Sequence, residues 1–355
     1  MNNKFLTSSH GKLSCIGCHG GEDSPDKDTA HRDLVADPSA DQGGVCAKCH
    51  QETATKFAQS LHYNLNGFRN SLAAFSDPAV LDKGSPMSTV FSLNCNNCHA
   101  SCGQCHFSQP NAIKGGLLAQ HDLQSTPPMD KTCYGCHGAR NAGEFTGNVG
   151  PIADVHYNKL DMSCEDCHPV SNFHGSGKPD SEMFKASDLP TCTSCHKDIV
   201  NGKSKVVMHN VHEPDTMSCQ VCHSQASQNC YDCHISFTDE KKSAVTSKSH
   251  PETLFKIGLN PDRDPQHPWK YVVLRHIPTV SDSFAAAGSN LLPNYDSIPN
   301  WKMSPTHNIQ RFTPQNTDCK ACHGNERMFL RQQDLTETDS RANENLVVKK
   351  IPKKI

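Results

Sequence analysis

The sequence contains few of the side chains that fill an ordinary protein core. Apolar residues make up 35% of its 355 residues and aromatic residues 6%, whereas typical globular chains are about 45–50% apolar. No stretch approaches the roughly 18 consecutive apolar residues of a membrane-spanning helix, so we expect no membrane span. The length alone would predict about two or three domains, but this composition does not supply several conventional cores.

The charge of the chain gives no sign of a nucleic-acid partner. The formal net charge is −3, and lysines gather only near the end of the sequence, at Lys349, Lys350, Lys353 and Lys354. We interpret this end as a solvated tail, and we expect no nucleic-acid binding.

No cysteine is left over for a disulfide, a zinc site or a nucleophile, because all 20 fall in C-x-x-C-H groups. The cysteines of the ten groups are Cys15, Cys18, Cys46, Cys49, Cys95, Cys98, Cys102, Cys105, Cys133, Cys136, Cys164, Cys167, Cys192, Cys195, Cys219, Cys222, Cys230, Cys233, Cys319 and Cys322. The histidines that complete them are His19, His50, His99, His106, His137, His168, His196, His223, His234 and His323.

This spacing has a chemical reason. Two thiols separated by two residues can each form a thioether with one vinyl group of a haem, and the histidine that follows then ligates the iron. A single such group would also fit half a zinc site, a redox-active dithiol or part of an iron–sulfur site. None of these alternatives predicts a histidine at the same offset in all ten groups. We therefore expect ten covalently bound c-type haems (heme c) as the cofactors.

Ten haems would supply the apolar mass that the side chains lack. The predicted fold is mostly coil with short helices wrapped around a haem array, with little β-structure and a haem-dominated core. Short helices are expected at the C-x-x-C-H groups and a helical turn in 204–212, and Lys270–Arg275 is β-prone. We predict a nine-haem array in 1–234, a haem-free covering segment that supplies distal histidines in 235–318, and the tenth haem with a charged C-terminal tail in 319–355. Residues 324–355 are expected to be partly unpacked.

Twelve of the 22 histidines lie outside the motifs. Any one of them alone would be interpreted as an ordinary surface or core residue. Ten haems need at most ten further ligands, however, so we predict that most of the twelve bind iron and that two are surplus. The nine methionines, which are the competing ligands, are expected to pack instead. The twelve candidates are His10, His31, His62, His121, His156, His174, His209, His212, His250, His267, His276 and His307.

The positions of these histidines predict specific partners. Residues 1–234 hold nine motifs but eight of the twelve, so at least one ligand must come from later in the chain or from another chain. His307 is predicted to serve the tenth haem. His209 and His212 share a face if their segment is helical, and would serve two adjacent haems. His10 is predicted to reach a neighbouring subunit, and such a head-to-tail contact generates an open polymer.

The chain resembles the multihaem c-type cytochromes of bacterial extracellular and periplasmic electron transfer. The resemblance rests on the motif doublet in 95–106 and on the segments 156–174 and 307–324. It implies electron transfer with other redox proteins or an extracellular acceptor. Some members of the group form haem-lined filaments, and others lie in outer-membrane conduits or shuttle in the periplasm.

The location predicted is extracellular or at the cell surface, with the periplasm as the alternative. Residues 1–6 lack the apolar region of a signal peptide. Because haem attachment of this kind follows export, we expect the sequence to be a mature form.

Two classes of function fit ten haems. The first is a pure electron carrier, not an enzyme, in which every iron has six ligands. The second is a multihaem oxidoreductase that reduces nitrogen or sulfur oxyanions at one open iron. Multihaem nitrite reductases typically mark that haem with a lysine in place of the motif histidine. All ten motifs here end in histidine, which favours the carrier.

Overall fold

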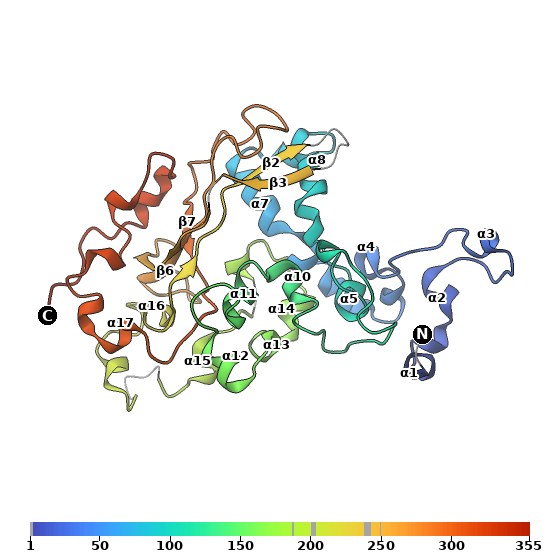
Figure 1. Cartoon of the computed structure of the whole chain (residues 1–355), viewed down its shortest axis with the longest axis horizontal. Helices are drawn as coiled ribbons and strands as arrows, with labels where there is room; N and C mark the ends of the chain where they lie inside the picture. Colours follow the sequence, from blue (N-terminus) through green and yellow to red (C-terminus); the bar gives the residue numbers. More distant parts are fainter. Residues whose placement is uncertain (1–2, 187, 200–203, 238–242, 249) are drawn as a thin grey trace. The chain divides into compact units, whose positions relative to one another are not determined.

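A computed structural model of the chain describes residues 3–186, 188–199, 204–237, 243–248 and 250–355. Short helices joined by irregular segments make up most of it, and strands are few (Figure 1). This confirms the prediction of a mostly coil fold with short helices and little β-structure. Among the described residues, no helix combines the length and the apolar character that crossing a bilayer requires.

In the part of the chain that the structure describes, no α-helix is longer than ten residues. Their bounds are α1 Asn3–Thr7, α2 Cys15–His19, α3 Lys27–Ala30, α4 Ala40–Gly43, α5 Gln51–Phe57, α6 Leu61–Asn64, α7 Asn66–Phe75, α8 Pro86–Leu93, α9 Gly103–His106, α10 Cys133–His137, α11 Asn141–Thr146, α12 Val155–Leu160, α13 Cys164–Cys167, α14 Val170–His174, α15 Cys192–Cys195, α16 Cys219–His223 and α17 Pro314–Thr317. Several 3-10 turns join them, including Cys95–Cys98, Val207–Asn210 and Cys319–Ala321.

Helices or 3-10 turns form at nine of the ten C-x-x-C-H motifs, as predicted; the ninth is the exception, because Cys233 and His234 lie in strand β2 (Cys233–Phe237). Helices α2, α10, α13, α15 and α16 each begin at the first cysteine of a motif. Residues three and four apart lie on one face of a helix, so a single turn presents both thiols and the histidine together. Local caps fix the start of some of these turns: the Ser14 side chain accepts a hydrogen bond from the Gly17 amide, and Ser163 and Asp166 form a capping box.

The chain divides into two compact units that interleave along the sequence. Unit 1 comprises Met1–Arg69, Cys95–Gly138 and Ser163–Leu189, and unit 2 comprises Asn70–Asn94, Ala139–Met162 and Pro190–Ile355. Unit 1 therefore carries the first six motifs. Unit 2 carries the other four, together with the motif-free segment 235–318.

Unit 2 contains an antiparallel sheet in the order β5 (Lys256–Leu259), β6 (Tyr271–His276) and β7 (Trp301–Met303). Strand β6 confirms the prediction of a strand at Lys270–Arg275, and β7 lies beside it in Figure 1. Alternate residues of β6 point to opposite faces. Val273 packs with one apolar cluster, which includes Val221 and Phe329, and Val272 and Leu274 pack with another, which includes Trp301 and Leu330. Two short ladders accompany this sheet: β1 (Ser227–Gln228) with β4 (Thr253–Leu254), and β2 (Cys233–Phe237) with β3 (Ser243–Ser247).

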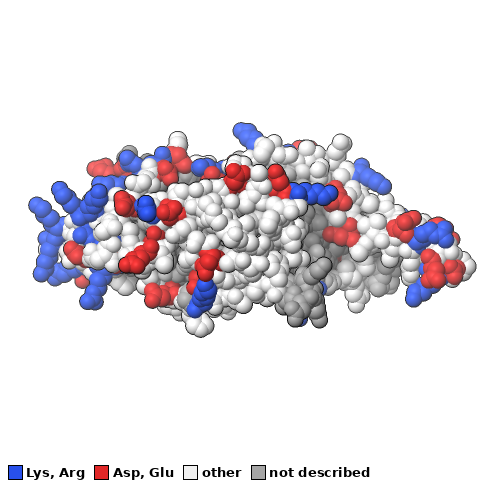
Figure 2. All heavy atoms as spheres, turned by 90° about the horizontal axis from the view of Figure 1, so that it is seen from above, with Lys and Arg blue, Asp and Glu red and all other residues white. Residues whose placement is uncertain are grey.

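The C-terminal segment belongs to the core of unit 2, so the expectation that it is partly unpacked is wrong. Leu346, Val347 and Val348 are buried, and the Leu346 carbonyl accepts a hydrogen bond from the Leu259 amide of β5. Three consecutive apolar residues inside a polar stretch are enough to anchor it. The lysines that follow are exposed, and Figure 2 shows basic side chains gathered at the surface around the C-terminus.

Candidate haem sites

Seven motif histidines face a second histidine drawn from the twelve outside the motifs. In unit 1 the ring-centre distances are 6.1 Å for His19–His121, 6.2 Å for His50–His10, 5.9 Å for His106–His174 and 6.3 Å for His137–His62. In unit 2 they are 6.1 Å for His196–His156, 5.9 Å for His223–His209 and 6.4 Å for His323–His212.

These distances fit two imidazoles that share one iron. A metal–imidazole nitrogen bond is about 2 Å long and the ring centre lies about 1 Å beyond the nitrogen, so two rings on opposite sides of a metal have centres about 6 Å apart. Aromatic pairs in direct contact spread over about 4.5–7 Å, whereas these seven fall between 5.9 and 6.4 Å. A porphyrin supplies four iron ligands itself. Two histidines therefore suffice, and the described residues contain no cluster of three or more metal-ligating side chains.

The motif rings are oriented by backbone carbonyls behind them. The Nδ1 atoms lie 2.8 Å from Val35 O for His19, 2.6 Å from Gln124 O for His106, 3.0 Å from Gln310 O for His223 and 3.0 Å from Lys353 O for His323. A carbonyl only accepts, so Nδ1 carries the proton and Nε2 presents its lone pair. Histidines that ligate metals are typically held in this way. Nothing in the sequence marks these carbonyls, and sequence reasoning missed them.

Four of the facing histidines are held in the neutral form that binds a metal. Burial, followed by the nearby His137, lowers the pKa of His62 to about 4. Burial also lowers the pKa of His174, His209 and His212, and the motif histidine that each one faces lowers it further. Protonation competes with coordination, so these environments favour iron binding near neutral pH. At His156, by contrast, the hydrogen bond that Nδ1 donates to the Asp154 carboxylate raises the pKa.

The thiols of different motifs approach one another within unit 1. Hydrogen bonds link Cys46 with Cys102, Cys98 with Cys136 and Cys133 with Cys164, and in each pair the accepting thiol has its pKa lowered to about 7. Weaker electrostatic contacts link Cys18 with Cys46 and Cys105 with Cys133. The motifs of unit 1 therefore form a row in the order first, second, fourth, fifth and sixth. The third motif lies beside the fifth.

Unit 2 repeats this arrangement on a smaller scale. Cys219 accepts a hydrogen bond from Cys192, which lowers its pKa to about 7. Cys222 interacts electrostatically with Cys322, although burial is the larger cause of its raised pKa. The seventh, eighth and tenth motifs are thus neighbours. Haems attached at neighbouring motifs would lie close to one another, as electron hopping requires.

The remaining motif histidines have other surroundings. The ring centre of His99 lies 4.7 Å from that of Tyr63, too close for a metal ion between the two rings. His168 Nδ1 lies 3.0 Å from the side-chain oxygen of Asn172. His234 is buried in β2.

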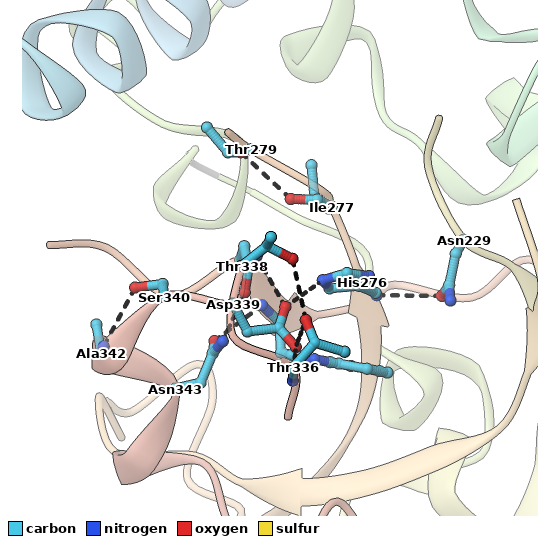
Figure 3. Close-up of polar contacts among 12 residues, drawn as sticks. Asn229, His276, Ile277, Thr279, Thr336, Thr338, Asp339, Ser340, Ala342 and Asn343 are labelled. Carbon is cyan, nitrogen blue, oxygen red and sulfur yellow. Dashed lines mark hydrogen bonds and ion pairs between the residues drawn. The ribbon is translucent and has the colours of Figure 1, made fainter. Parts of the chain in front are cut away.

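His276 does not fit the ligand role predicted for it. Its Nε2 lies 2.7 Å from the Asp339 carboxylate, toward which the ring points in Figure 3. The ring also stacks on Trp301 with centres 4.8 Å apart. Both contacts belong to the packing of the sheet, so we interpret His276 as a structural residue.

The other four predicted candidates lie apart from the seven facing pairs. His267 contacts Asp264 through Nδ1 at 3.2 Å and packs edge-on against Trp269. The His307 amide donates a hydrogen bond to Glu144. His31 and His250 are exposed.

Two predicted partners differ from those in the structure. His212, not His307, faces His323 of the tenth motif. His10 faces His50 of its own chain, so the N-terminal arm does not need a neighbouring subunit to place this histidine. The prediction for His209 and His212 agrees with the geometry, because they face histidines of two neighbouring motifs.

An open hollow of about 560 Å³ lies beside the tenth motif. It is lined by Phe312, Thr313, Pro314, Thr317, Asp318 and Ala321. Its volume is within the range of about 300–1,000 Å³ typical of cofactor pockets. The ring of Phe312 is 69% exposed, and a flat apolar group in the hollow would cover it.

No protein-family model, curated protein or solved structure matches this chain.

Proposed function

We propose that this protein transfers electrons along ten haem c groups, each attached to one C-x-x-C-H motif, and that it is not an enzyme. The seven histidine pairs at 5.9–6.4 Å carry this proposal, because that spacing fits an iron held between two imidazoles. Each bound haem iron accepts and releases one electron. The chain offers two imidazoles to seven of the ten irons, keeps four of the distal imidazoles neutral and sets the motifs side by side.

Low reduction potentials are expected, since histidine rather than methionine fills the distal positions. The proposed setting is extracellular or at the cell surface, with other redox proteins or an extracellular acceptor as partners. At the seven motifs with a facing histidine, six ligands would leave no position for a substrate, which argues against reduction of nitrogen or sulfur oxyanions there.

The test combines mass and spin state. Intact mass after acid–acetone extraction, which removes only unattached haem, should correspond to the chain with ten haems. Electron paramagnetic resonance of the oxidised protein should show low-spin iron. Fewer attached haems, or zinc in place of iron, would contradict haem attachment at all ten motifs. A strong high-spin signal with turnover of nitrite or tetrathionate would favour the oxidoreductase.

A head-to-tail homopolymer is a separate proposal. Since His10 faces His50, the exposed His31 at the end of α3 is the histidine of the N-terminal segment that a second copy can reach. Electron microscopy of the purified protein should show fibres that are lost in His31→Ala. A monomer at high concentration would exclude the polymer and leave electron transfer untouched.

A further inference from the structure

Arg275 is a buried cation whose hydrogen-bonding capacity is mostly unused. Its side chain is 1% exposed, as is that of Glu144, the carboxylate to which its Nη2 donates. Its Nε and Nη1 atoms are buried and have no hydrogen-bond partner within the described part of the chain. Burying two donor atoms of a guanidinium without any acceptor destabilises the folded state.

A second guanidinium makes the imbalance larger. Arg140 interacts electrostatically with both Arg275 and Glu144, and its own Nε is buried without a partner among the described residues. Two guanidinium groups against one carboxylate leave one positive charge uncompensated. Arg140 is only partly buried. Water would satisfy the donors of the two side chains but would not neutralise the charge, whereas a carboxylate would do both.

Two hydroxyl groups extend the cluster. The Ser304 amide donates to the Val273 carbonyl at 2.9 Å, so Ser304 continues β7 opposite Val273. Residues directly opposite share a face of a sheet, and Arg275 is on the same face as Val273. The hydroxyls of Ser304 and Thr306 are buried and unpartnered in the described structure. The Ser304 hydroxyl therefore lies on the same side of the sheet as Arg275, and Thr306 follows it by two residues.

We propose that Arg275 and Arg140, with the hydroxyls of Ser304 and Thr306, form an internal binding site for one carboxylate group. A carboxylate brings the missing negative charge, and its two oxygens accept paired hydrogen bonds from a guanidinium fork. Glu144 accepts from Nη2 of Arg275, so Nε and Nη1 remain as donors to the incoming group.

The carboxylate can come from two sources. The first, which rests on the proposed function, is a propionate of a haem in unit 2. A haem attachment point lies close by, because the Cys230 amide donates to the His276 carbonyl at 3.0 Å and the Cys230 thiol interacts electrostatically with Arg275. The second source is a small free carboxylate from solution, for which acetate is the probe.

Arg140→Gln tests the site, because it removes the excess charge and leaves the Arg275–Glu144 pair in place. Arg341→Gln is the matched control, since the Arg341 side chain is 90% exposed and in the same unit. If a propionate fills the site, spectroelectrochemistry of Arg140→Gln should show one haem with a lower potential. A tenfold change in its oxidised-to-reduced ratio corresponds to about 59 mV for a one-electron couple. The haem potentials of Arg341→Gln should equal those of the natural sequence.

The second arm titrates both variants and the natural sequence with acetate. A free-carboxylate site predicts a saturable rise in melting temperature that is at least tenfold weaker in Arg140→Gln, whereas a propionate-filled site predicts no saturable response in any of them. The proposal is overturned if Arg140→Gln matches Arg341→Gln in both arms. High-resolution density for the unsubstituted protein decides without any variant: a carboxylate beside Arg275 supports the site, and water alone refutes it. Fewer than ten attached haems would contradict the proposed function. The acetate titration and the electron density would still test the carboxylate site independently.

Discussion

His212 and His307 are both candidates for the tenth haem, and a substitution distinguishes them. His212 faces His323 at 6.4 Å, so His212→Ala should leave that iron with five ligands. About one haem in ten should then become high-spin and bind added imidazole, which electron paramagnetic resonance and optical titration measure.

The control removes the tenth haem itself. With Cys319 and Cys322 both replaced by Ala, His212→Ala should add no further high-spin signal. His307→Ala should produce no high-spin signal from the tenth haem. A His212→Ala protein that stays fully low-spin would show that another side chain ligates this iron.

Sequence reasoning at the residue scale recovers residue types and misses partners. The offsets within a C-x-x-C-H motif are local, so every attachment cysteine and motif histidine is visible in the sequence. Facing partners are separated by long stretches of chain: His19 and His121 are brought together by the fold, as are His276 and Asp339. Nothing local distinguishes His276, which Asp339 engages, from His212, which faces a motif histidine.

At the scale of elements, strands β5 and β6 approach so closely that β5 needs a glycine. A Cβ placed on Gly258 would lie 2.1 Å from Leu274 Cδ1 and 3.0 Å from the Leu346 carbonyl oxygen. Gly258→Ala should therefore displace Leu274 and lower the free energy of unfolding by about 1–3 kcal/mol, as overpacking of a core does. Denaturant unfolding followed by circular dichroism measures the change.

Gly288 provides the matched control in the same unit. Its nearest neighbour would be 3.6 Å from a new Cβ, an ordinary contact. Gly288→Ala should be neutral or slightly stabilising, because alanine restricts the unfolded chain. Equal stabilities for the two variants would mean that the strands separate easily at Gly258.

Elements with a strong local pattern were predictable, and elements that depend on distant partners were not. The β-prone run at β6 and the helical turns at the motifs were identified from sequence. Strands β5 and β7 have four and three residues and are defined by pairing with β6. The burial of residues 346–348 could not be predicted locally, because it depends on Leu259 and Val272 of a strand pair far away in the sequence.

Across the whole molecule, the two units obtain their apolar cores differently. Among the described residues, the buried hydrophobic side chains of unit 1 are Ala54, Phe57 and Leu65, although this unit carries six motifs. Unit 2 carries four motifs and also two packed clusters on either face of its sheet. A unit whose side chains bury so little apolar surface cannot offset its own conformational entropy. We therefore expect unit 1 to depend on the proposed haems for its stability, whereas unit 2 also has its own packed clusters.

This difference predicts how the chain behaves without haem. A chain made where no haem is attached should keep amide hydrogen-exchange protection in β5 and β6, because Ile257, Val273 and Phe329 still pack together. In unit 1 helix α5, which is ordered in the complete protein, should exchange at the rate of an unfolded peptide. The haem-loaded chain, measured by the same mass-spectrometric exchange, should protect both regions. Protection of α5 in the haem-free chain would contradict the dependence of unit 1 on haem, and loss of protection in β6 would mean that the sheet of unit 2 depends on haem as well.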